Sequence, residues 1–374
     1  MDLDALIADT REMVECESPS ADLEAVARSA EVVARVGRRR LGVEPVRIVL
    51  DGRTHLRWRL GTGPSRVLLV GHHDTVWATG SLATRPCTVE GGVLRGPGCF
   101  DMKAGLAMAF QAAAGLDGVT VLVTGDEELG SPSSRAMIED EARIASAALV
   151  LEGAGPGGAL KSARKGVSLY DVVVRGRAAH AGLEPERGIN ATLELAHQAL
   201  AVAALGDPLT GTTVTPTAAR AGATTNTIPA EGSFAVDVRV RTLAEQDRVD
   251  LAIRSLGPVL PGARTLVTGG PNRPPMEAES SAQLLDRVRA IAERLGLPPV
   301  PAMAVGGASD GNFTAGVGTP TLDGLGAVGG GAHADDEHVL VDELPGRTRL
   351  VRSLITELLA VPTAECDTAG AGRR

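Results

Sequence analysis

The sequence is poor in two residue types that stabilise small extracellular domains, cysteine and the aromatics. Of 374 residues only 2% are aromatic and four are cysteines. The cysteines are Cys16, Cys87, Cys99 and Cys366, and no two of them form a C-x-x-C pair. This spacing argues against a disulfide framework and against a cysteine-based zinc site. With 44% hydrophobic residues, a chain of this length can instead bury an aliphatic core and needs no such crosslinks.

The sequence also lacks a basic excess and a long apolar run. Its 37 Lys and Arg residues face 46 Asp and Glu residues, which gives a formal net charge of −9. An acidic chain without a polybasic tract repels phosphate backbones, so we expect no nucleic-acid partner. No stretch of about 18 apolar residues is present, so we expect no membrane span. The first residues, MDLDALIADT, lack the basic and apolar regions of a secretory signal, and we therefore expect a cytoplasmic protein.

The first 150 residues alternate between short apolar runs and stretches with helical spacing. We predict strands over Val67–Val70, Val119–Val123 and Ala147–Leu151, and helices over 4–14, 23–36 and 103–114. The strand segments lack the in-and-out alternation of a half-exposed strand, which indicates burial on both faces. The pattern predicts an α/β fold, with a mostly parallel sheet flanked by helices.

A second unit begins near Gly166, where the pattern changes. We predict strands over Leu169–Val174 and Ser233–Val240, and helices over 190–204 and 243–256. The second strand alternates clearly, so one face of its sheet is expected to be open. We therefore expect an inserted α+β domain at residues 166–272, which splits a main domain into residues 1–165 and 273–374. The glycine- and proline-rich segment 269–275 is expected to be the linker back to the main domain.

Metal-binding residue types follow the predicted buried strands. His72 and Asp74 follow the first strand, Glu127 and Glu128 the second, and Glu152 the third. Because ligands bind beyond the carboxyl ends of strands in open α/β sheets, these side chains are expected to meet at one edge. The i, i+2 spacing of His72 and Asp74 would place both on the same side of a strand.

Two further loops can reach the same edge. Asp101 precedes a predicted helix, where it could alternatively be only an N-cap, and His333 follows a glycine-rich loop. His338 competes with His333, but we assign it to the exposed start of a helix at Asp335–His338. Histidine, Asp and Glu without thiolates are the ligands of hydrolytic zinc sites or of related divalent ions. The surplus of carboxylates favours two metals about 3.5–4 Å apart, bridged by one carboxylate.

The remaining histidines and several other motifs give weaker evidence of function. We interpret His73 as a spacer, and His55 and His197 as ordinary surface or helix residues. Arg164, Lys165 and the amides of 306–310 are weaker anion-binding candidates. The dinucleotide-binding fingerprint fails, and neither a phosphate-binding loop nor a Gly-x-Ser-x-Gly nucleophile motif is present.

Together, these motifs resemble the co-catalytic di-zinc metallopeptidase family of glutamate carboxypeptidase, acetylornithine deacetylase and succinyl-diaminopimelate desuccinylase. The matching segments run in family order along most of the chain: Gly71–Val76, Gly96–Gly105, Asp126–Gly130, Glu152, Ala179–Gly182, Asn226–Pro229, Asp237–Arg239 and the His333 loop. The segment Glu184–Ala191 looks closest to the glutamate carboxypeptidase branch.

The resemblance implies a role for each matching residue in the metal centre. The implied metal ligands are His72, Asp101, Glu128, Glu152 and His333. Asp101 would bridge the two metals, Glu128 and His333 would complete one site, and Glu152 the other. Asp74 would orient the ring of His72.

The resemblance also implies catalytic and substrate-binding residues. Glu127 would be the general base, which takes a proton from water and passes it to the leaving amine. His180, on the inserted domain, would stabilise the oxyanion, in relatives across a dimer interface. Asn226 and Arg239 would hold the free carboxylate of the substrate.

The sequence thus predicts a hydrolase that cleaves an amide bond next to a free carboxylate, most like a glutamate carboxypeptidase. It would use two Zn²⁺, with Co²⁺ or Mn²⁺ as alternatives, and form a homodimer through the inserted domain. Its substrate would be a small peptide or an N-acyl amino acid. One alternative is an N-acyl-amino-acid deacylase. Another, of a different class, is a non-catalytic amino-acid-binding protein on the same fold.

Overall fold

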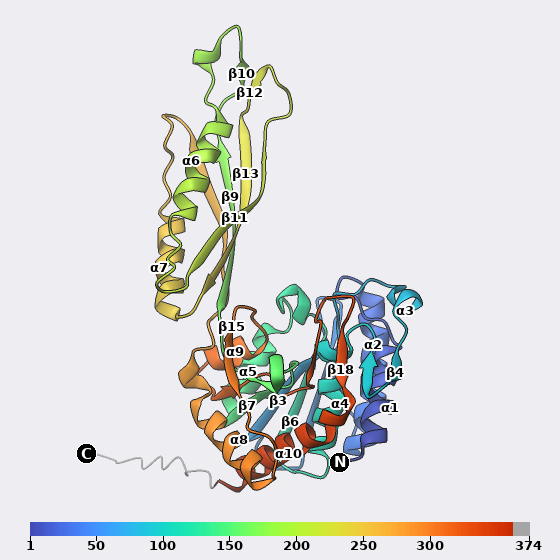
Figure 1. Ribbon diagram of the computed structural model, residues 1–374. Coiled ribbons are helices and arrows are strands. Elements are labelled where there is room, and N and C mark those ends of the chain that lie inside the picture. The colour runs from blue at the N-terminus through green and yellow to red at the C-terminus, as the bar shows by residue number, and fades with distance from the viewer. Residues whose placement is uncertain (362–374) are drawn as a thin grey trace, which may run out of the picture.

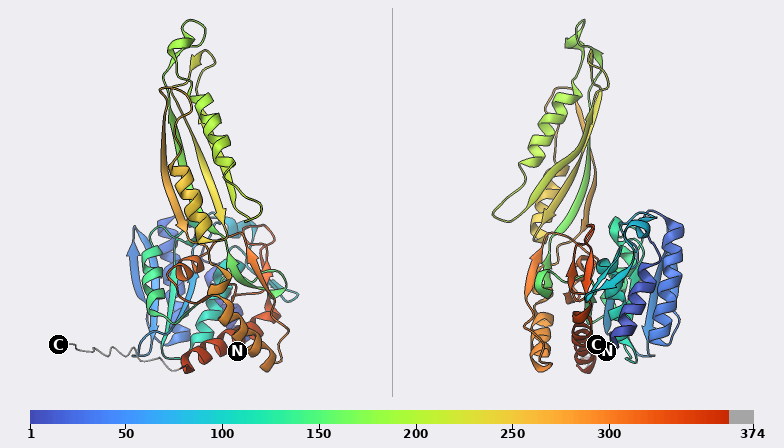
Figure 2. Two further views of the ribbon diagram at one scale, coloured as in Figure 1. Left: turned by 90° about the vertical axis from the view of Figure 1, so that its left-hand side faces the viewer. Right: turned by 45° about the vertical axis from the view of Figure 1, so that its right-hand side comes forward.

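The computed structural model describes residues 1–361 and shows two units joined by two crossings of the chain (Figure 1). The main unit comprises residues 1–165 and 274–361, and the inserted unit comprises residues 166–273. The inserted unit projects from the main unit as an elongated arm (Figure 2). Among the described residues, no helix is both long and apolar enough to cross a membrane.

The main unit is built on a mixed six-stranded sheet. Its strands, in spatial order, are β1 (Val46–Leu50), β2 (Arg53–Leu60), β6 (Val119–Thr124), β3 (Val67–His72), β7 (Ala147–Val150) and β16 (Thr321–Leu322). β6, β3, β7 and β16 pair in parallel, whereas β1 and β2 are antiparallel. The predicted α/β class with a mostly parallel sheet is confirmed.

Helices cover both faces of this sheet. They are α1 (Leu3–Val14), α2 (Leu23–Leu41), α4 (Ala104–Ala113), α8 (Ala282–Arg294) and α10 (Leu344–Ala360) on one side, with α5 (Arg135–Ile144) and α9 (Gly311–Gly316) on the other. In β3, Val67 and Leu69 belong to the core on the first side, whereas Leu68 and Val70 pack with Phe313 on the second. Burial of both faces explains why the run is continuously apolar.

Small sheets hold the connecting loops of the main unit together. β17 (Gly329–Gly330), β18 (His338–Leu340), β5 (Val93–Arg95) and β4 (Thr88–Glu90) form one sheet, β8 (Leu160–Arg164) pairs with β15 (Ala302–Val305), and α3 (Ser81–Thr84) is a short helix. The predicted helix start at Asp335–His338 is wrong, because His338 begins strand β18. Since β18 pairs with β5, the loop of His333 lies beside the loop of Asp101.

The inserted unit has an antiparallel four-stranded sheet with helices on one face. The strand order is β11 (Thr213–Ala221), β13 (Glu231–Val240), β9 (Gly166–Arg175) and β14 (Arg264–Arg273), with α6 (Ala191–Ala203) and α7 (Leu243–Arg254) packed against it. In β13, Phe234, Val236 and Val238 are buried and alternate with partly exposed residues, as its pattern predicts. The two-residue strands β10 (Ala179–His180) and β12 (Thr227–Ile228) lie at the far tip (Figures 1 and 2).

The predicted linker at 269–275 is largely wrong, because residues 269–273 are the end of strand β14. β14 is an edge strand, so Pro271 can occupy it without removing a hydrogen bond from a central ladder. The register shifts between Pro271 and Arg273, and Gly269 takes a positive φ of 85°. Residues that signal a turn therefore mark an irregular strand end here.

Candidate metal centre

Two histidines and several carboxylates from separate loops meet beyond the carboxyl ends of the sheet. His72 ends β3, and its Nε2 lies 3.2 Å from Asp101 Oδ1 and 3.5 Å from Glu152 Oε1. His333 Nε2 lies 3.3 Å from Asp101 Oδ2 and 3.2 Å from Glu128 Oε2. The two oxygens of Asp101 thus face two different histidines, as expected of a carboxylate shared between two sites.

The five predicted ligands and the predicted base form one cluster. Donor atoms of His72, Glu127 and Glu152 lie within 4.8 Å of one another, and so do donor atoms of His72, Asp101 and Glu128. Nitrogen and oxygen donors without sulfur suit Zn²⁺, Co²⁺ and Mn²⁺. The N-cap alternative for Asp101 is not supported, because its side chain makes no capping hydrogen bond to α4.

The electrostatics of the cluster also favour bound cations. Burial raises the pKa of Glu127 and of Glu128 above the ordinary glutamate value. Hydrogen bonds to Asp101 and Glu128 raise the pKa of His333 to about 10. A bound cation would stabilise the ionised forms of Glu127 and Glu128. The donor set and its charge therefore fit a divalent metal centre.

Asp74 is fully buried. The sequence predicts that its carboxylate orients His72, and the structure shows a further role. His72 Nδ1 lies 2.9 Å from the main-chain oxygen of Asp74 and 3.5 Å from the carboxylate oxygen Oδ1. The carboxylate accepts hydrogen bonds from the amides of Glu127 and Glu128, at 3.2 and 3.3 Å, and from Ser20 Oγ at 2.7 Å. Asp74 therefore orients His72 mainly through its main chain and holds the loop of the predicted base with its side chain.

Arg273 is part of the site, although no sequence motif predicts it. Its Nη2 lies 3.0 Å from Glu127 Oε1, 3.1 Å from Asp310 Oδ1 and 2.8 Å from Ser131 Oγ. The guanidinium is buried and lies 5.2 Å from the ring centre of Phe313. An arginine in a glycine- and proline-rich segment carries no signal of this role. It reaches the base only because β14 returns the chain to the main unit.

The three predicted functional residues of the inserted unit do not lie together. His180 on β10 and Asn226 just before β12 are exposed and lie at the tip of the arm (Figures 1 and 2). Arg239 lies near the other end of β13, where it forms an ion pair with Asp237 at 2.8 Å. At roughly 3.3 Å per strand residue, Asn226 and Arg239 are more than about 25 Å apart. One chain alone therefore does not bring them to the same carboxylate.

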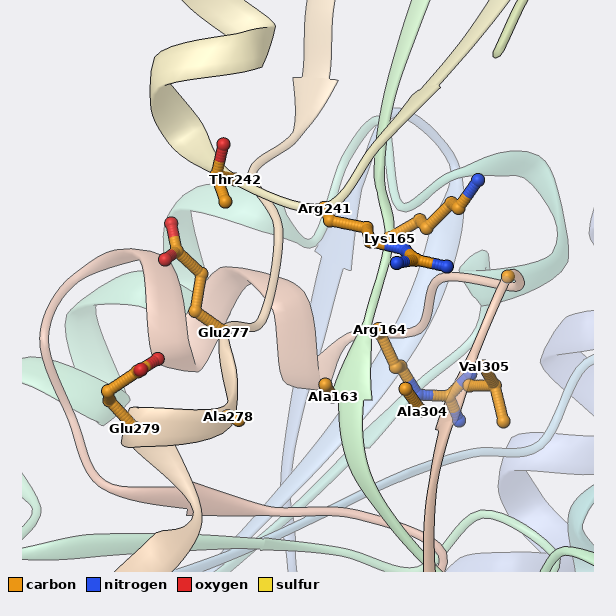
Figure 3. Close-up of a pocket in the computed structure, with 11 residues that line it drawn as sticks. Ala163, Arg164, Lys165, Arg241, Thr242, Glu277, Ala278, Glu279, Ala304 and Val305 are labelled. Atoms are coloured by element: carbon orange, nitrogen blue, oxygen red, sulfur yellow. The ribbon is translucent and has the colours of Figure 1, made fainter. Parts of the chain in front are cut away.

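The weaker anion-binding candidates line a different cavity, of about 350 Å³, between the two units (Figure 3). Lys165 and Arg241 lie on its wall, and Arg164 is buried there. Arg164 Nε pairs with Asp323 at 2.6 Å, and Nη1 donates to the carbonyl of Gly307 at 2.9 Å. Arg164 thus ties main-unit segments together and is not part of the metal cluster.

Of the other histidines, two are buried and neither faces the cluster. His73 lies 3.0 Å from the carbonyl oxygen of Thr54 and 3.2 Å from Ser29 Oγ, which agrees with a structural spacer. The interpretation of His55 as a surface residue is wrong, because it is fully buried on β2. His197 is exposed on α6.

Comparison with known proteins points to one family. A profile described as peptidase family M20/M25/M40 matches residues 68–357. The chain is 32% identical to carboxypeptidase G2 of Pseudomonas sp. (strain RS-16) over 297 residues, which cover 75% of this chain and 70% of the relative.

Solved structures show the same fold. Aminopeptidase PepT from Bacillus cereus superimposes with a TM-score of 0.76 at 22% identity, covering 96% of this chain and 99% of that one. A dinuclear metal-binding peptidase of the M20 family from Bacillus subtilis gives a TM-score of 0.63 at 16% identity, covering 96% and 99%. Sequence and fold agree, and the chain belongs to peptidase family M20/M25/M40.

Proposed function

We propose that this protein is a metal-dependent carboxypeptidase that releases a C-terminal amino acid, with glutamate as the leading candidate. One observation carries the proposal: a carboxylate oxygen of Glu127 lies within 4.8 Å of donor atoms of His72 and Glu152, so a base lies beside a cation site. The identity to a relative named carboxypeptidase G2 supports cleavage next to a free carboxylate.

The distances between the side chains support two cation positions. His72 and Glu152 would hold one ion, His333 and Glu128 the other, and Asp101 both. We propose Zn²⁺, with Co²⁺ or Mn²⁺ able to replace it. When bound, such ions polarise the scissile carbonyl and acidify water.

Glu127 is the proposed general base. Its carboxylate takes a proton from the attacking water and passes it to the nitrogen of the leaving amine. Burial raises the pKa of Glu127, while the charge of Arg273 opposes that shift. Arg273, 3.0 Å away, therefore fixes the position of the base and moderates its basicity.

We also propose that the active form is a homodimer joined through the inserted unit. His180 and Asn226 lie at the tip of the arm, so they can reach a metal cluster only if it belongs to another copy of the chain. α6 presents Leu193 and Leu200 with 54% and 72% exposure, and β11 is an unpaired sheet edge. Exposed apolar side chains beside a free edge are typical of an interface. His180 would then stabilise the oxyanion in the partner's active site, while Asn226 of one chain and Arg239 of the other would bind the substrate carboxylate.

A panel of peptidyl and N-acyl amino acids, with released amine as the readout, tests the substrate class. The carboxypeptidase proposal expects hydrolysis of peptides that end in a free carboxylate and no hydrolysis of the same peptides as C-terminal amides. Preference for N-acetyl or N-succinyl amino acids would instead favour a deacylase. Binding of amino acids without any turnover would favour the non-catalytic alternative.

A further inference from the structure

A carboxylate outside the predicted ligand set, Glu337, is bound by four donors. Its side chain is buried, with 4% exposure. Oε1 accepts hydrogen bonds from the amides of Phe100 at 2.9 Å and Asp101 at 3.0 Å. Oε2 accepts hydrogen bonds from the amide of Gly98 at 2.9 Å and from the indole Nε1 of Trp77 at 2.8 Å.

These four donors come from the segments that carry the metal cluster. The amides belong to the loop of Asp101, and Trp77 follows the segment that holds His72 and Asp74. Glu337 itself is four residues after His333, on the loop between β17 and β18. His333 has a positive φ of 62°, a conformation that a non-glycine residue holds only where the surroundings enforce it. One carboxylate thus connects three segments that supply ligands.

The four hydrogen bonds to Glu337 are strong enough to fix the position of the Asp101 loop. Hydrogen bonds to an ionised carboxylate are shorter and stronger than neutral ones, and loss of the acceptor would leave buried amides without partners. Asp101 faces both histidines, so a small displacement of its loop changes both cation positions.

We propose that Glu337 is a positioning residue, which holds the Asp101 loop against the His333 loop so that both can bind cations. It acts through these residues and contacts neither substrate nor metal. The inference rests on the proposed function, since it assumes that the cluster binds two ions. Groups that orient metal ligands typically contribute about 10–100-fold to metal affinity.

The test is titration of metal-free protein with Co²⁺, followed by visible absorption and by tryptophan fluorescence. The chain has two tryptophans. Trp58 is fully buried against Phe110, whereas Trp77 donates a hydrogen bond to Glu337. A change in fluorescence that accompanies Co²⁺ binding is therefore assigned to Trp77. For Glu337→Gln we expect one or both ions to bind about 10–100-fold more weakly. Its fluorescence response to Co²⁺ should also shrink.

The matched control is Asp336→Asn, which removes the same charge from an exposed neighbour on the same loop. It should bind both ions with wild-type affinity. Trp77→Phe removes one of the four donors without a change in charge, and should weaken binding in the same direction by less. Thermal unfolding of the metal-free proteins checks that each variant is folded.

Equal Co²⁺ affinities in wild type and folded Glu337→Gln would overturn the positioning role and leave the proposed function intact. A wild-type protein that binds no Co²⁺ would overturn both. If Asp336→Asn weakens binding as much as Glu337→Gln, the effect is one of loop charge and the proposal fails.

Discussion

The proposed functional residues occur in two regions that differ sharply in structure. At the edge of the main sheet, His72, Asp74 and Glu127 are buried, and each is held by hydrogen bonds or ion pairs to other loops. At the tip of the inserted unit, His180 on the two-residue strand β10 and Asn226 just before β12 are exposed.

The difference indicates a division of labour. A cluster of ligands must be preorganised by packing, because like charges repel one another until a cation binds. A residue that acts on the substrate after it enters can instead lie on a mobile or separate part of the assembly. The cluster should therefore depend on its own chain, and the tip should depend on a second copy.

Removal of metal should have the largest effect on activity, because the proposed ions polarise the scissile carbonyl and acidify water. It acts on the buried region alone. Prolonged treatment with a chelator should abolish hydrolysis, and Zn²⁺, Co²⁺ or Mn²⁺ should restore it. Metal analysis of the active protein should give two ions per chain. Full activity in a verified metal-free protein would remove the basis of the proposal.

Replacement of the base should be nearly as severe while leaving the metal content unchanged. Glu127→Gln keeps the shape but cannot accept the proton, so kcat should fall about 10²–10⁴-fold. Glu24→Gln, with a side chain that is 92% exposed, is the matched control and should keep full activity. If Glu127→Gln retains the wild-type kcat, Glu127 is not the general base.

Substitution at the tip tests whether the second region acts in trans. His180→Ala should lower kcat about 10²–10³-fold, as expected when an oxyanion donor is lost. Subunits of Glu127→Gln and His180→Ala, mixed and allowed to exchange, should recover roughly a quarter of wild-type activity. Half of the dimers would be mixed, and each would contain one complete site. No recovery despite proven exchange would show that His180 does not act on a partner.

A smaller effect should appear in the pH dependence of the free energy of unfolding, to which a buried histidine of the main unit contributes and an exposed one of the inserted unit does not. Burial lowers the pKa of His55 below its usual 6.5, and its Nδ1 accepts the amide of Gly125 at 3.2 Å. The unfolded chain gains a proton near pH 6.5 and the folded chain does not. The contribution of this group to the free energy of unfolding should therefore be largest above pH 6.5 and fall below it, by at most about 1.4 kcal/mol per pH unit.

Urea unfolding at pH 5 to 8 measures this slope. His55→Gln should flatten it, whereas His197→Gln, at an exposed site of the inserted unit, should leave it unchanged. An identical slope in all three proteins would exclude His55 as a contributor to the acid sensitivity.

Much of the metal cluster could be predicted because its residues follow strands with a strong local signal. Val67–Val70 and Val119–Val123 are apolar because both faces are covered, and residues that end parallel strands must meet at one edge. Glu337 and Arg273 could not be predicted in this way. Their roles depend on contacts with residues more than a hundred positions away, and neither lies in a periodic segment.

The sequence by itself determined the α/β class, the second unit and the set of histidines and carboxylates that could bind metal, because periodicity and strand ends are local properties. Only the tertiary structure decided that Asp74 holds the base loop, that Arg273 pairs with Glu127, and that His180 and Asn226 lie far from the cluster of their own chain. These are distances between segments remote in sequence, and the packing of the whole chain sets them.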